Sequence, residues 1–257
     1  MASQIVHLWY CIKRNCTLLF HMTHEENFLF PDVNGFKGKV LDDHLAAGFY
    51  RIQYFMFTTH AILLEADNDP MPVFWLRTWV KKIKPTKSAS AIIAKCKAFT
   101  IHFKHVTITT ETEALYDLYK DHIDFSVSDS CSSYLENIFI DNPFTSCMIE
   151  IRDGDKLIAV GYFDLGENAL AGILNFYHPH YKKYSLGKYL ILLKINYALQ
   201  NNIALYYSGY MSSAITKFDY KIFPDITAME VFLPIEKKWL PYVSMGKEGL
   251  KEYAKRL

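Results

Sequence analysis

The sequence has few of the features that build disulfide scaffolds, metal sites or membrane spans. Five cysteines (Cys11, Cys16, Cys96, Cys131 and Cys147) occur among 257 residues, and none forms a CxxC pair of the kind typical of zinc or redox sites. No uncharged apolar run approaches the length of roughly 18 residues that a membrane span needs. Lys13 and Arg14 interrupt the apolar first twenty residues, which argues against a secretory signal. We therefore expect a cytoplasmic protein with reduced thiols, no metal and no membrane contact.

The composition itself is that of a folded globular protein. Hydrophobic residues make up 51% of the chain, aromatic residues 16% and charged residues only 21%, which excludes disorder and a collagen-like chain. A chain of 257 residues fits one large domain or two small ones. Length alone does not decide between them.

A formal net charge of +1 hides two regions of opposite charge. No acidic residue occurs between Asp69 and Glu111, whereas ten acids against two basic residues lie from Asp121 to Glu167. The acid-free region contains Arg77, Lys81, Lys82, Lys84, Lys87, Lys95, Lys97 and Lys104, interleaved with Trp75, Trp79 and Phe99. Such a region fits a polyanion, since lysines contact phosphates and aromatic faces stack bases. A solvated lysine-rich face is the simpler alternative.

The first 110 residues read mainly as short strands and loops. Aromatic and β-branched runs predict strands over 50–59, 73–80 and 99–110. Helical spacing of apolar residues predicts a helix over 112–123, started by Thr110 or Thr112. We place a domain boundary there, between a strand-rich basic domain at 1–110 and a second domain at 111–257.

The second half has the clearer pattern. Alternation predicts strands over 147–151, 157–163 and 170–177, with hairpin turns at 153–155 and 166–168. A helix is expected from Ser185, its N-cap, to Asn201, followed by a strand over 203–210 that pairs in parallel with the previous strand. An antiparallel meander, a helix and a parallel strand predict an α+β fold of the GNAT acyltransferase type. In that fold the start of the helix offers free N–H groups to a phosphate-bearing acyl donor.

Several motifs in one order extend this prediction. They are Leu157-Ile158-Ala159-Val160-Gly161, Phe176-Tyr177-His178-Pro179, Ser185-Leu186-Gly187-Lys188-Tyr189, Tyr207-Ser208-Gly209-Tyr210 and Lys217-Phe218-Asp219-Tyr220-Lys221. Over residues 157–224 the chain resembles the arginyl-tRNA protein transferases and the bacterial leucyl-tRNA protein transferases. A weaker resemblance to the same family occurs at Ala47-Gly48-Phe49-Tyr50-Arg51 and at Lys84-Pro85-Thr86-Lys87-Ser88.

The resemblance implies an enzyme that moves Arg or Leu from a charged tRNA to the α-amine of a protein, often one with an acidic first residue. Aminoacyl-tRNA is then a co-substrate, and no cofactor is expected. The ester is already activated, so the site must orient amine and ester, accept a proton and stabilise the oxyanion. The family's N-terminal cysteine motifs are missing here, which puts a metal or iron–sulfur role in doubt for this chain.

Candidate site residues follow from the motifs. Tyr177, His178 and Tyr210 are the candidate catalytic residues, at the ends of two neighbouring strands that would form the acyl cleft. The candidate substrate-binding residues are Ser185, Leu186, Gly187, Lys188, Tyr189, Tyr207, Gly209, Lys217, Tyr220 and Lys221, with Lys217 and Lys221 expected on one helical face. The candidate nucleic-acid contacts are Arg51, Lys84, Lys87, Lys182 and Lys183. A structural alternative stands beside these roles, in which the tyrosines are core aromatics and the lysines a solvated face.

Two other functions remain open from the sequence. An acyl-CoA-dependent N-acyltransferase would keep the fold and change the donor, although the segment Tyr184-Ser185-Leu186-Gly187-Lys188-Tyr189 lacks the usual Arg/Gln-x-x-Gly-x-Gly/Ala form. A non-catalytic RNA-binding relative would keep the basic region and lose the chemistry.

Overall fold

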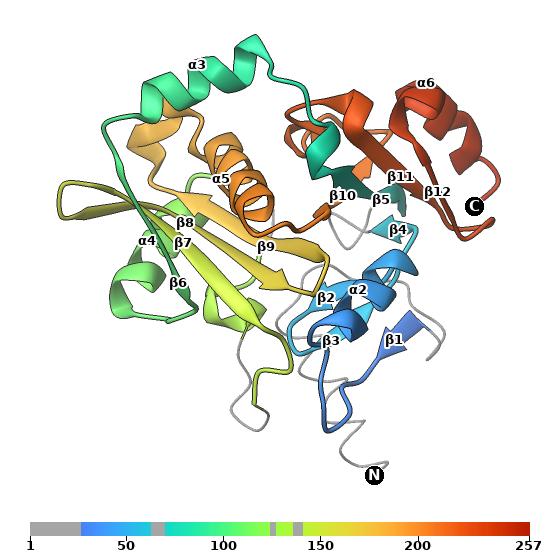
Figure 1. The fold of residues 1–257 in the computed structure, drawn as a ribbon, viewed down its shortest axis with the longest axis horizontal. Helices are drawn as coiled ribbons and strands as arrows, with labels where there is room; N and C mark the ends of the chain where they lie inside the picture. Colours follow the sequence, from blue (N-terminus) through green and yellow to red (C-terminus); the bar gives the residue numbers. More distant parts are fainter. Residues whose placement is uncertain (1–26, 63–69, 124–126, 136–140) are drawn as a thin grey trace.

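The computed structural model describes residues 27–62, 70–123, 127–135 and 141–257, so the expectation for the first twenty residues lies outside the described part. Figure 1 shows a mixed fold with one large sheet, a small sheet and helices on both faces of the large sheet. Among the described residues, no helix combines the length and apolar character that crossing a membrane would need.

The large sheet has nine strands, and eight of them follow the order β12-β11-β5-β10-β9-β8-β7-β6, while β4 pairs with β5 beside that path. The bounds are β4 Ala61–Ile62, β5 Met71–Trp79, β6 Thr100–His105, β7 Ser146–Asp153, β8 Lys156–Leu165, β9 Ala169–Tyr177, β10 Leu205–Ser212, β11 Met229–Leu233 and β12 Lys238–Pro241. β7, β8 and β9 pair antiparallel in chain order, and β10 pairs parallel to β9. The strands expected at 147–151, 157–163, 170–177 and 203–210 are therefore present.

Two layers of helix cover the centre of this sheet. Helix α5, Leu186–Gln200, packs on β8 and β9 with α3, Lys87–Cys96, in one buried cluster, while α4, Thr110–Lys120, packs on β8 and β9 in another. In Figure 1, α3 and α5 lie together on the same side of the strands. Because α5 is apolar on most of its circumference, it is largely buried, as its sequence predicts.

The small sheet has the order β1-β3-β2, with β1 Phe28–Leu29, β2 Tyr50–Ile52 and β3 Phe55–Phe57. The single strand expected over 50–59 was wrong, because Gln53 adopts a positive φ of 55° and turns the chain into a hairpin. Helix α2, Lys39–Ala46, precedes this hairpin. Gly48 joins them at φ 85°, and a Cβ there would lie 2.4 Å from the Phe232 ring, so a side chain would be excluded.

The remaining elements are short except for the C-terminal helix. They are η2 Val80–Lys82, η3 Ser132–Tyr134, η4 Pro179–Tyr184, η5 Asp219–Ile222, η6 Ile226–Ala228 and α6 Tyr242–Ala254. β11, β12 and α6 enclose a separate apolar cluster at the β5 end of the sheet.

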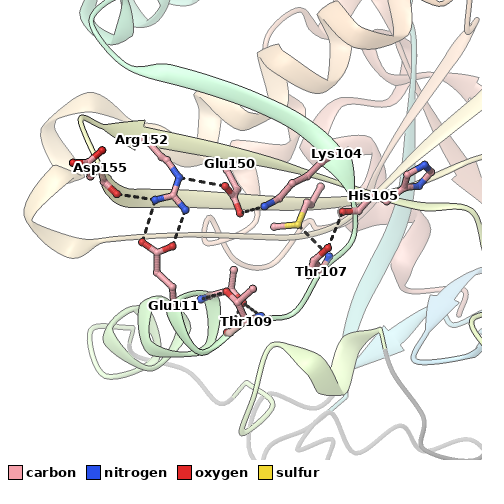
Figure 2. Close-up of polar contacts among 10 residues, drawn as sticks. Lys104, His105, Thr107, Thr109, Glu111, Glu150, Arg152 and Asp155 are labelled. Atoms are coloured by element: carbon pink, nitrogen blue, oxygen red, sulfur yellow. Dashed lines mark hydrogen bonds and ion pairs between the residues drawn. The ribbon is translucent and has the colours of Figure 1, made fainter.

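A polar network stabilises the opposite edge of the sheet, where, among the described strands, β6 pairs with β7 alone (Figure 2). Lys104 Nζ on β6 contacts Glu150 Oε1 at 2.6 Å, and Arg152 Nη2 contacts Glu111 Oε2 of α4 at 2.7 Å. Thr109 caps α4 by accepting the Thr112 N–H, so the N-cap is neither Thr110 nor Thr112, and α4 begins and ends earlier than the helix expected over 112–123. Lys104, one of the eight basic residues of the acid-free region, is thus neutralised within the fold.

Residues 71–105 contribute β5 and β6 to the same large sheet as the strands that follow residue 145. Both strands are hydrogen-bonded to it, β5 to β10 and β6 to β7. The boundary between 110 and 111 stays a prediction.

Candidate functional site

The parallel strands β9 and β10 pair over only three residues, and this defines the candidate site. Leu205, Tyr206 and Tyr207 pair with 169–171, after which β9 continues along β8 and β10 continues along β5. A register shift between Tyr207 and Gly209 marks the change. Tyr177 ends β9 and Tyr210 lies near the end of β10, so both follow the point where pairing stops.

Tyrosines from four elements converge beyond that point. Tyr119 of α4 lies 5.6 Å from Tyr177 between ring centroids. Tyr220 on η5 is 39% exposed as a residue, but the atoms packed around its hydroxyl raise its pKa, and the hydroxyls of Tyr210, Tyr134 and Tyr177 raise it further. Burial likewise raises the pKa of Tyr119, with a contribution from Tyr220. We call Tyr119, Tyr177, Tyr210 and Tyr220 the tyrosine cluster. The raised pKa values of Tyr119 and Tyr220 keep these two hydroxyls protonated, so both can donate hydrogen bonds.

Lys221 lies against this cluster. Its Nζ is 4.4 Å from the centroid of the Tyr210 ring and 5.1 Å from that of Phe218. Within the described ranges no carboxylate forms an ion pair with it. Burial lowers the pKa of Lys221 to about 8. Roughly one lysine in ten is then neutral at pH 7, which makes it a competent proton acceptor.

Gly209 permits the approach of this lysine. Its φ of 93° lies in the region that favours glycine, and a Cβ there would lie 3.1 Å from Lys221 Nζ. The predicted role of Gly209 at the site therefore has a backbone explanation.

Helix α5 begins beside the cluster. The first helical hydrogen bond runs from the Tyr189 N–H to the Ser185 O at 3.0 Å, so the N–H groups of Leu186, Gly187 and Lys188 precede it. A Cβ on Gly187 would lie 3.6 Å from the Tyr177 ring, which places the helix start against that tyrosine. Ser185 directly follows η4 and is at the N-cap position of α5, with a φ of 55°. Its side chain makes no capping hydrogen bond. The positive end of the helix dipole therefore lies next to the tyrosine cluster.

His178 is held in one orientation just after Tyr177. It is 9% exposed, and its Nδ1 accepts the His180 N–H at 3.3 Å. Burial lowers its pKa, and the charge of Lys156 lowers it further. The neutral ring therefore carries its proton on Nε2 and offers a donor there.

Exposed lysines lie on η2 and α3, which contact α5, and on η4, which directly precedes α5. They are Lys81 and Lys82 on η2, Lys84, Lys87 and Lys95 on or near α3, Lys97, and Lys182 and Lys183 on η4; we call them the basic face. Phe99, just after α3, packs against Tyr184 of η4 with 4.9 Å between the ring centroids. Lys188 Nζ lies 5.3 Å from the Phe223 ring. Two residues farther along the chain, Asp225 Oδ2 accepts the backbone N–H of Lys84 at 2.8 Å.

The structure corrects several of the predicted site residues. Arg51 is buried at 6% exposure and paired with Asp164 at 2.8 Å, so it does not reach a nucleic acid. Lys217 lies in a turn before the four-residue η5, so it shares no helical face with Lys221. The side chains of Leu186 and Tyr189 belong to the apolar core under α5, which leaves them only backbone contacts with a ligand.

Two residues of chemical interest were missed in the sequence. Tyr119 was treated only as part of an apolar helix stripe, although it lies in the tyrosine cluster. Lys194 is fully buried on α5, where its Nζ donates to the Tyr162 O and the Asn175 Oδ1, both at 2.8 Å. A lysine inside an apolar helix was the available signal.

Lys194 gives a pH-dependent prediction for stability. Burial lowers its pKa from 10.5 to about 7, so between these values the unfolded chain holds a proton that the folded chain has released. Stability should therefore rise with pH from 7 to 8.5, and Lys194→Met should reduce that slope by up to about 1.4 kcal/mol per pH unit. Urea unfolding at pH 7.0, 7.5, 8.0 and 8.5 measures the slope. Parallel curves for both proteins would show that Lys194 keeps its charge when buried.

Among the described residues, no group of three His, Cys, Asp or Glu side chains is placed to hold a metal ion.

Comparisons with known proteins show a likeness to one family over the part of the chain that contains the site. The family model "Arginine-tRNA-protein transferase, C terminus" matches residues 111–224, which contain the whole tyrosine cluster and Lys221. An aspartate/glutamate leucyltransferase of Shewanella sp. (strain MR-4) is 30% identical over 152 residues, which cover 57% of this chain and 62% of that protein. Arginyl-tRNA–protein transferase 1 of Arabidopsis thaliana is 28% identical over 172 residues, 58% of this chain and 27% of that protein. The chain thus spans about three fifths of the leucyltransferase, and the expected family resemblance is confirmed.

Solved structures are more distant. The C-terminal domain of a putative lysylphosphatidylglycerol synthetase from Agrobacterium fabrum aligns with a TM-score of 0.42 at 10% identity, covering 54% of this chain and 46% of that one. A fungal protein described as having a GCN5-related glucosamine N-acetyltransferase region aligns with a TM-score of 0.39 at 12% identity, covering 79% of this chain and 23% of that one.

Proposed function

We propose that this protein transfers an amino acid from a charged tRNA to the α-amine of a protein or peptide, because residues 111–224 match the C-terminal family model of the arginine-tRNA-protein transferases. One observation carries the proposal: the tyrosine cluster, Lys221 and the start of α5 meet within the matched segment. We further propose a GNAT-like acyltransferase arrangement, Arg or Leu as the transferred residue, and an acceptor with Asp or Glu first.

The chemistry that this arrangement can support begins with proton transfer. The acceptor amine attacks the ester carbonyl at the 3′ end of the tRNA, a C–N bond forms, and the carbonyl oxygen becomes an oxyanion. Neutral Lys221 accepts the proton that the amine loses and returns it to the ribose oxygen as the C–O bond breaks. The reaction needs no oxidant and no covalent enzyme intermediate, because the ester is already activated.

Hydrogen-bond donors would stabilise the oxyanion. We assign this role to the hydroxyls of Tyr177 and Tyr210, on the two strands that stop pairing at the site. His178 would act as a donor through Nε2–H, since its Nδ1 is occupied by the His180 N–H. Tyr220, also in the cluster, would line the aminoacyl group beside Lys221.

The tRNA would approach across the basic face. The N–H groups of Leu186, Gly187 and Lys188 would bind a phosphate or hydroxyl near the terminal adenosine, with Ser185 beside them. Lys84, Lys87, Lys182 and Lys183 would contact phosphates farther along the acceptor stem. Tyr207, near the start of β10, and Lys217, just before η5, remain proposed substrate contacts. We assign neither of them a part in the chemical step.

A transfer assay tests the function directly. The full chain is incubated with Arg-tRNA or Leu-tRNA, each labelled in the amino acid, and with peptides that begin with Asp or Glu. We expect label in the free peptide and none in the same peptide with an acetylated N-terminus. No transfer from any charged tRNA would overturn the proposal. Stabilisation by coenzyme A but not tRNA would favour an acyl-CoA-dependent enzyme, and salt-sensitive RNA binding without turnover would favour an RNA-binding relative.

The basic face gives a matched pair of variants for this assay. Lys182→Glu/Lys183→Glu should raise the KM for charged tRNA about tenfold and flatten its dependence on salt, because two exposed phosphate contacts are lost. Lys251→Glu/Lys255→Glu on α6 changes the net charge equally at a distant exposed site and should leave the KM nearly unchanged. Equal effects of the two variants would indicate that only overall charge matters.

A further inference from the structure

A side chain from the small sheet fills the point at which β9 and β10 separate. Tyr50, the first residue of β2, is 7% exposed, and its hydroxyl lies 2.6 Å from the Gly172 O of β9 and 2.9 Å from the Tyr207 O of β10. A hydroxyl has a single proton to donate, so the two carbonyls share it. Tyr50 therefore bridges the two strands at the place where their pairing ends.

The hydroxyl occupies a position that the strand ladder leaves open. The Leu205 N–H donates to the Asn168 O at 3.1 Å, and the alternation of a parallel ladder would then join the Gly172 O to the N–H of Gly209. The register of the two strands ends before this pair is reached. The Gly172 O accepts from the tyrosine hydroxyl instead, so this carbonyl keeps a donor where the ladder stops.

Gly172 is enclosed from the other face of the sheet as well. A Cβ there would lie 3.0 Å from the Tyr206 hydroxyl and 3.6 Å from Lys194 Nζ. Tyr206 belongs to the apolar cluster under α5, whereas Tyr50 belongs to the cluster that packs against α2. The two tyrosines thus reach the same glycine from different faces, which fixes the place at which the strands separate.

The ring of Tyr50 is linked to a residue that we assign to the reaction. It stacks on Trp75 with 4.9 Å between the ring centroids and an angle of 8° between the planes. Trp75 in turn packs edge-to-face against Tyr210 at 5.3 Å. A displacement of Tyr50 would therefore be transmitted to Tyr210 through one intervening ring.

Tyr50 is itself held firmly. It pairs with Phe57 in the small sheet, and the next residue, Arg51, forms the buried ion pair with Asp164 of β8 at 2.8 Å. Burial raises the pKa of Tyr50 well above its usual value. The hydroxyl thus stays protonated, and it remains a donor to the two carbonyls over the pH range in which the protein is folded.

We propose that Tyr50 is a positioning residue whose hydroxyl holds β9 and β10 apart, so that Tyr177 and Tyr210 can both face the aminoacyl ester. The role rests on the proposed transferase function, and Tyr50 itself would touch no reacting group. Tyr50 lies outside residues 111–224, so the small sheet would contribute to the site from outside the segment that the family model matches.

Tyr50→Phe removes the hydroxyl and keeps the ring on Trp75. We expect kcat for aminoacyl transfer to fall about 10- to 100-fold, because a catalytic group displaced by about 1 Å can cost about 100-fold in rate, while the KM for charged tRNA stays within about twofold. The pH dependence of kcat/KM should remain that of the wild type, since the hydroxyl exchanges no proton with the substrates.

Tyr253→Phe on α6 is the matched control. Tyr253 is 5% exposed, and its hydroxyl also has two partners, because it donates to Glu236 Oε2 and accepts the Ile235 N–H. This variant should lose a similar amount of thermal stability and keep the wild-type kcat. All variants are assayed at a temperature at which their melting curves show them to be folded. An unchanged kcat in Tyr50→Phe, or an equal loss of kcat in both variants, would overturn the proposal.

Hydrogen exchange of the full chain tests the bridge without any substrate. In Tyr50→Phe we expect faster exchange over residues 172–177 and 207–212 and wild-type rates over 146–165, because only the contact between β9 and β10 is lost. If the wild type transfers nothing, the proposed function fails, yet this local acceleration would still support the part of Tyr50 in holding the strands apart. Unchanged exchange in both segments, or acceleration spread evenly over the large sheet, would overturn the proposal whatever the transfer assay shows.

Discussion

Replacing Lys221 with methionine should lower kcat/KM for aminoacyl transfer by about 100- to 10,000-fold, the range expected for loss of a general base. Methionine keeps the length and apolar contacts of the lysine stem against Tyr210 and Phe218, so the fold is retained. Lys221→Arg should be equally inactive, because a guanidinium does not release its proton near pH 8. Lys251→Met, on α6, is the control and should keep wild-type activity.

The pH profile separates a proton acceptor from a purely structural lysine. An α-amine titrates at about pH 7.7 to 8.0 and must be neutral to attack. Burial brings the pKa of Lys221 to about 8, and it too must be neutral to act as a base. Below pH 7, log kcat/KM in the wild type should therefore rise with a slope of about two per pH unit, and in Lys221→Met with a slope of about one. Equal slopes would remove Lys221 from proton transfer.

The secondary structure around the site could be predicted because its signals are local. Alternating apolar residues marked β7, β8 and β9, and an unbroken apolar helix marked α5, since both patterns depend only on neighbouring residues. The pairing of β5 with β10 was not predicted, because it joins residues more than a hundred positions apart. Strand partners at that distance leave no periodic trace in the chain.

Site residues could be predicted where a motif reflects a backbone requirement, such as a glycine. They were harder to predict where the role of a side chain depends on whether it is buried. Gly209 stands beside Lys221 at a positive φ, where a Cβ would crowd the lysine, whereas a Cβ on Gly187 would make only an ordinary contact with Tyr177. Both glycines lie in motifs. Arg51 also lay in a motif, but its charge is directed inward to Asp164. Sequence alone does not distinguish an arginine that binds phosphate from one that completes a buried ion pair.

That buried pair gives the largest expected effect on stability. Arg51 Nη1 contacts Asp164 Oδ1 at 2.8 Å, and both side chains are at most 1% exposed. Arg51 also donates to Ser146 Oγ of β7 at 2.8 Å and to the Leu135 O, just after η3, at 2.9 Å, so it joins β2 to β8, to β7 and to the segment after η3. Removing one partner of such a pair leaves an uncompensated charge in the core.

Arg51→Met should therefore lower the free energy of unfolding at pH 7 by about 3–5 kcal/mol. Burial raises the pKa of Asp164, and Arg51 opposes that rise. Without Arg51 the folded protein binds a proton at Asp164 more readily than the unfolded chain, so the deficit should shrink as the pH falls from 7 toward 5. Urea unfolding at both pH values measures this change.

A double variant identifies the charge as the cause. Arg51→Met/Asp164→Asn removes both charges and keeps the hydrogen bond from Ser146 Oγ, which lies 2.5 Å from Asp164 Oδ1. It should recover part of the lost stability at pH 7 and remove the extra pH dependence. If the double variant were as unstable as Arg51→Met at both pH values, the five hydrogen bonds of the arginine, and not its charge, would hold β2 on the large sheet.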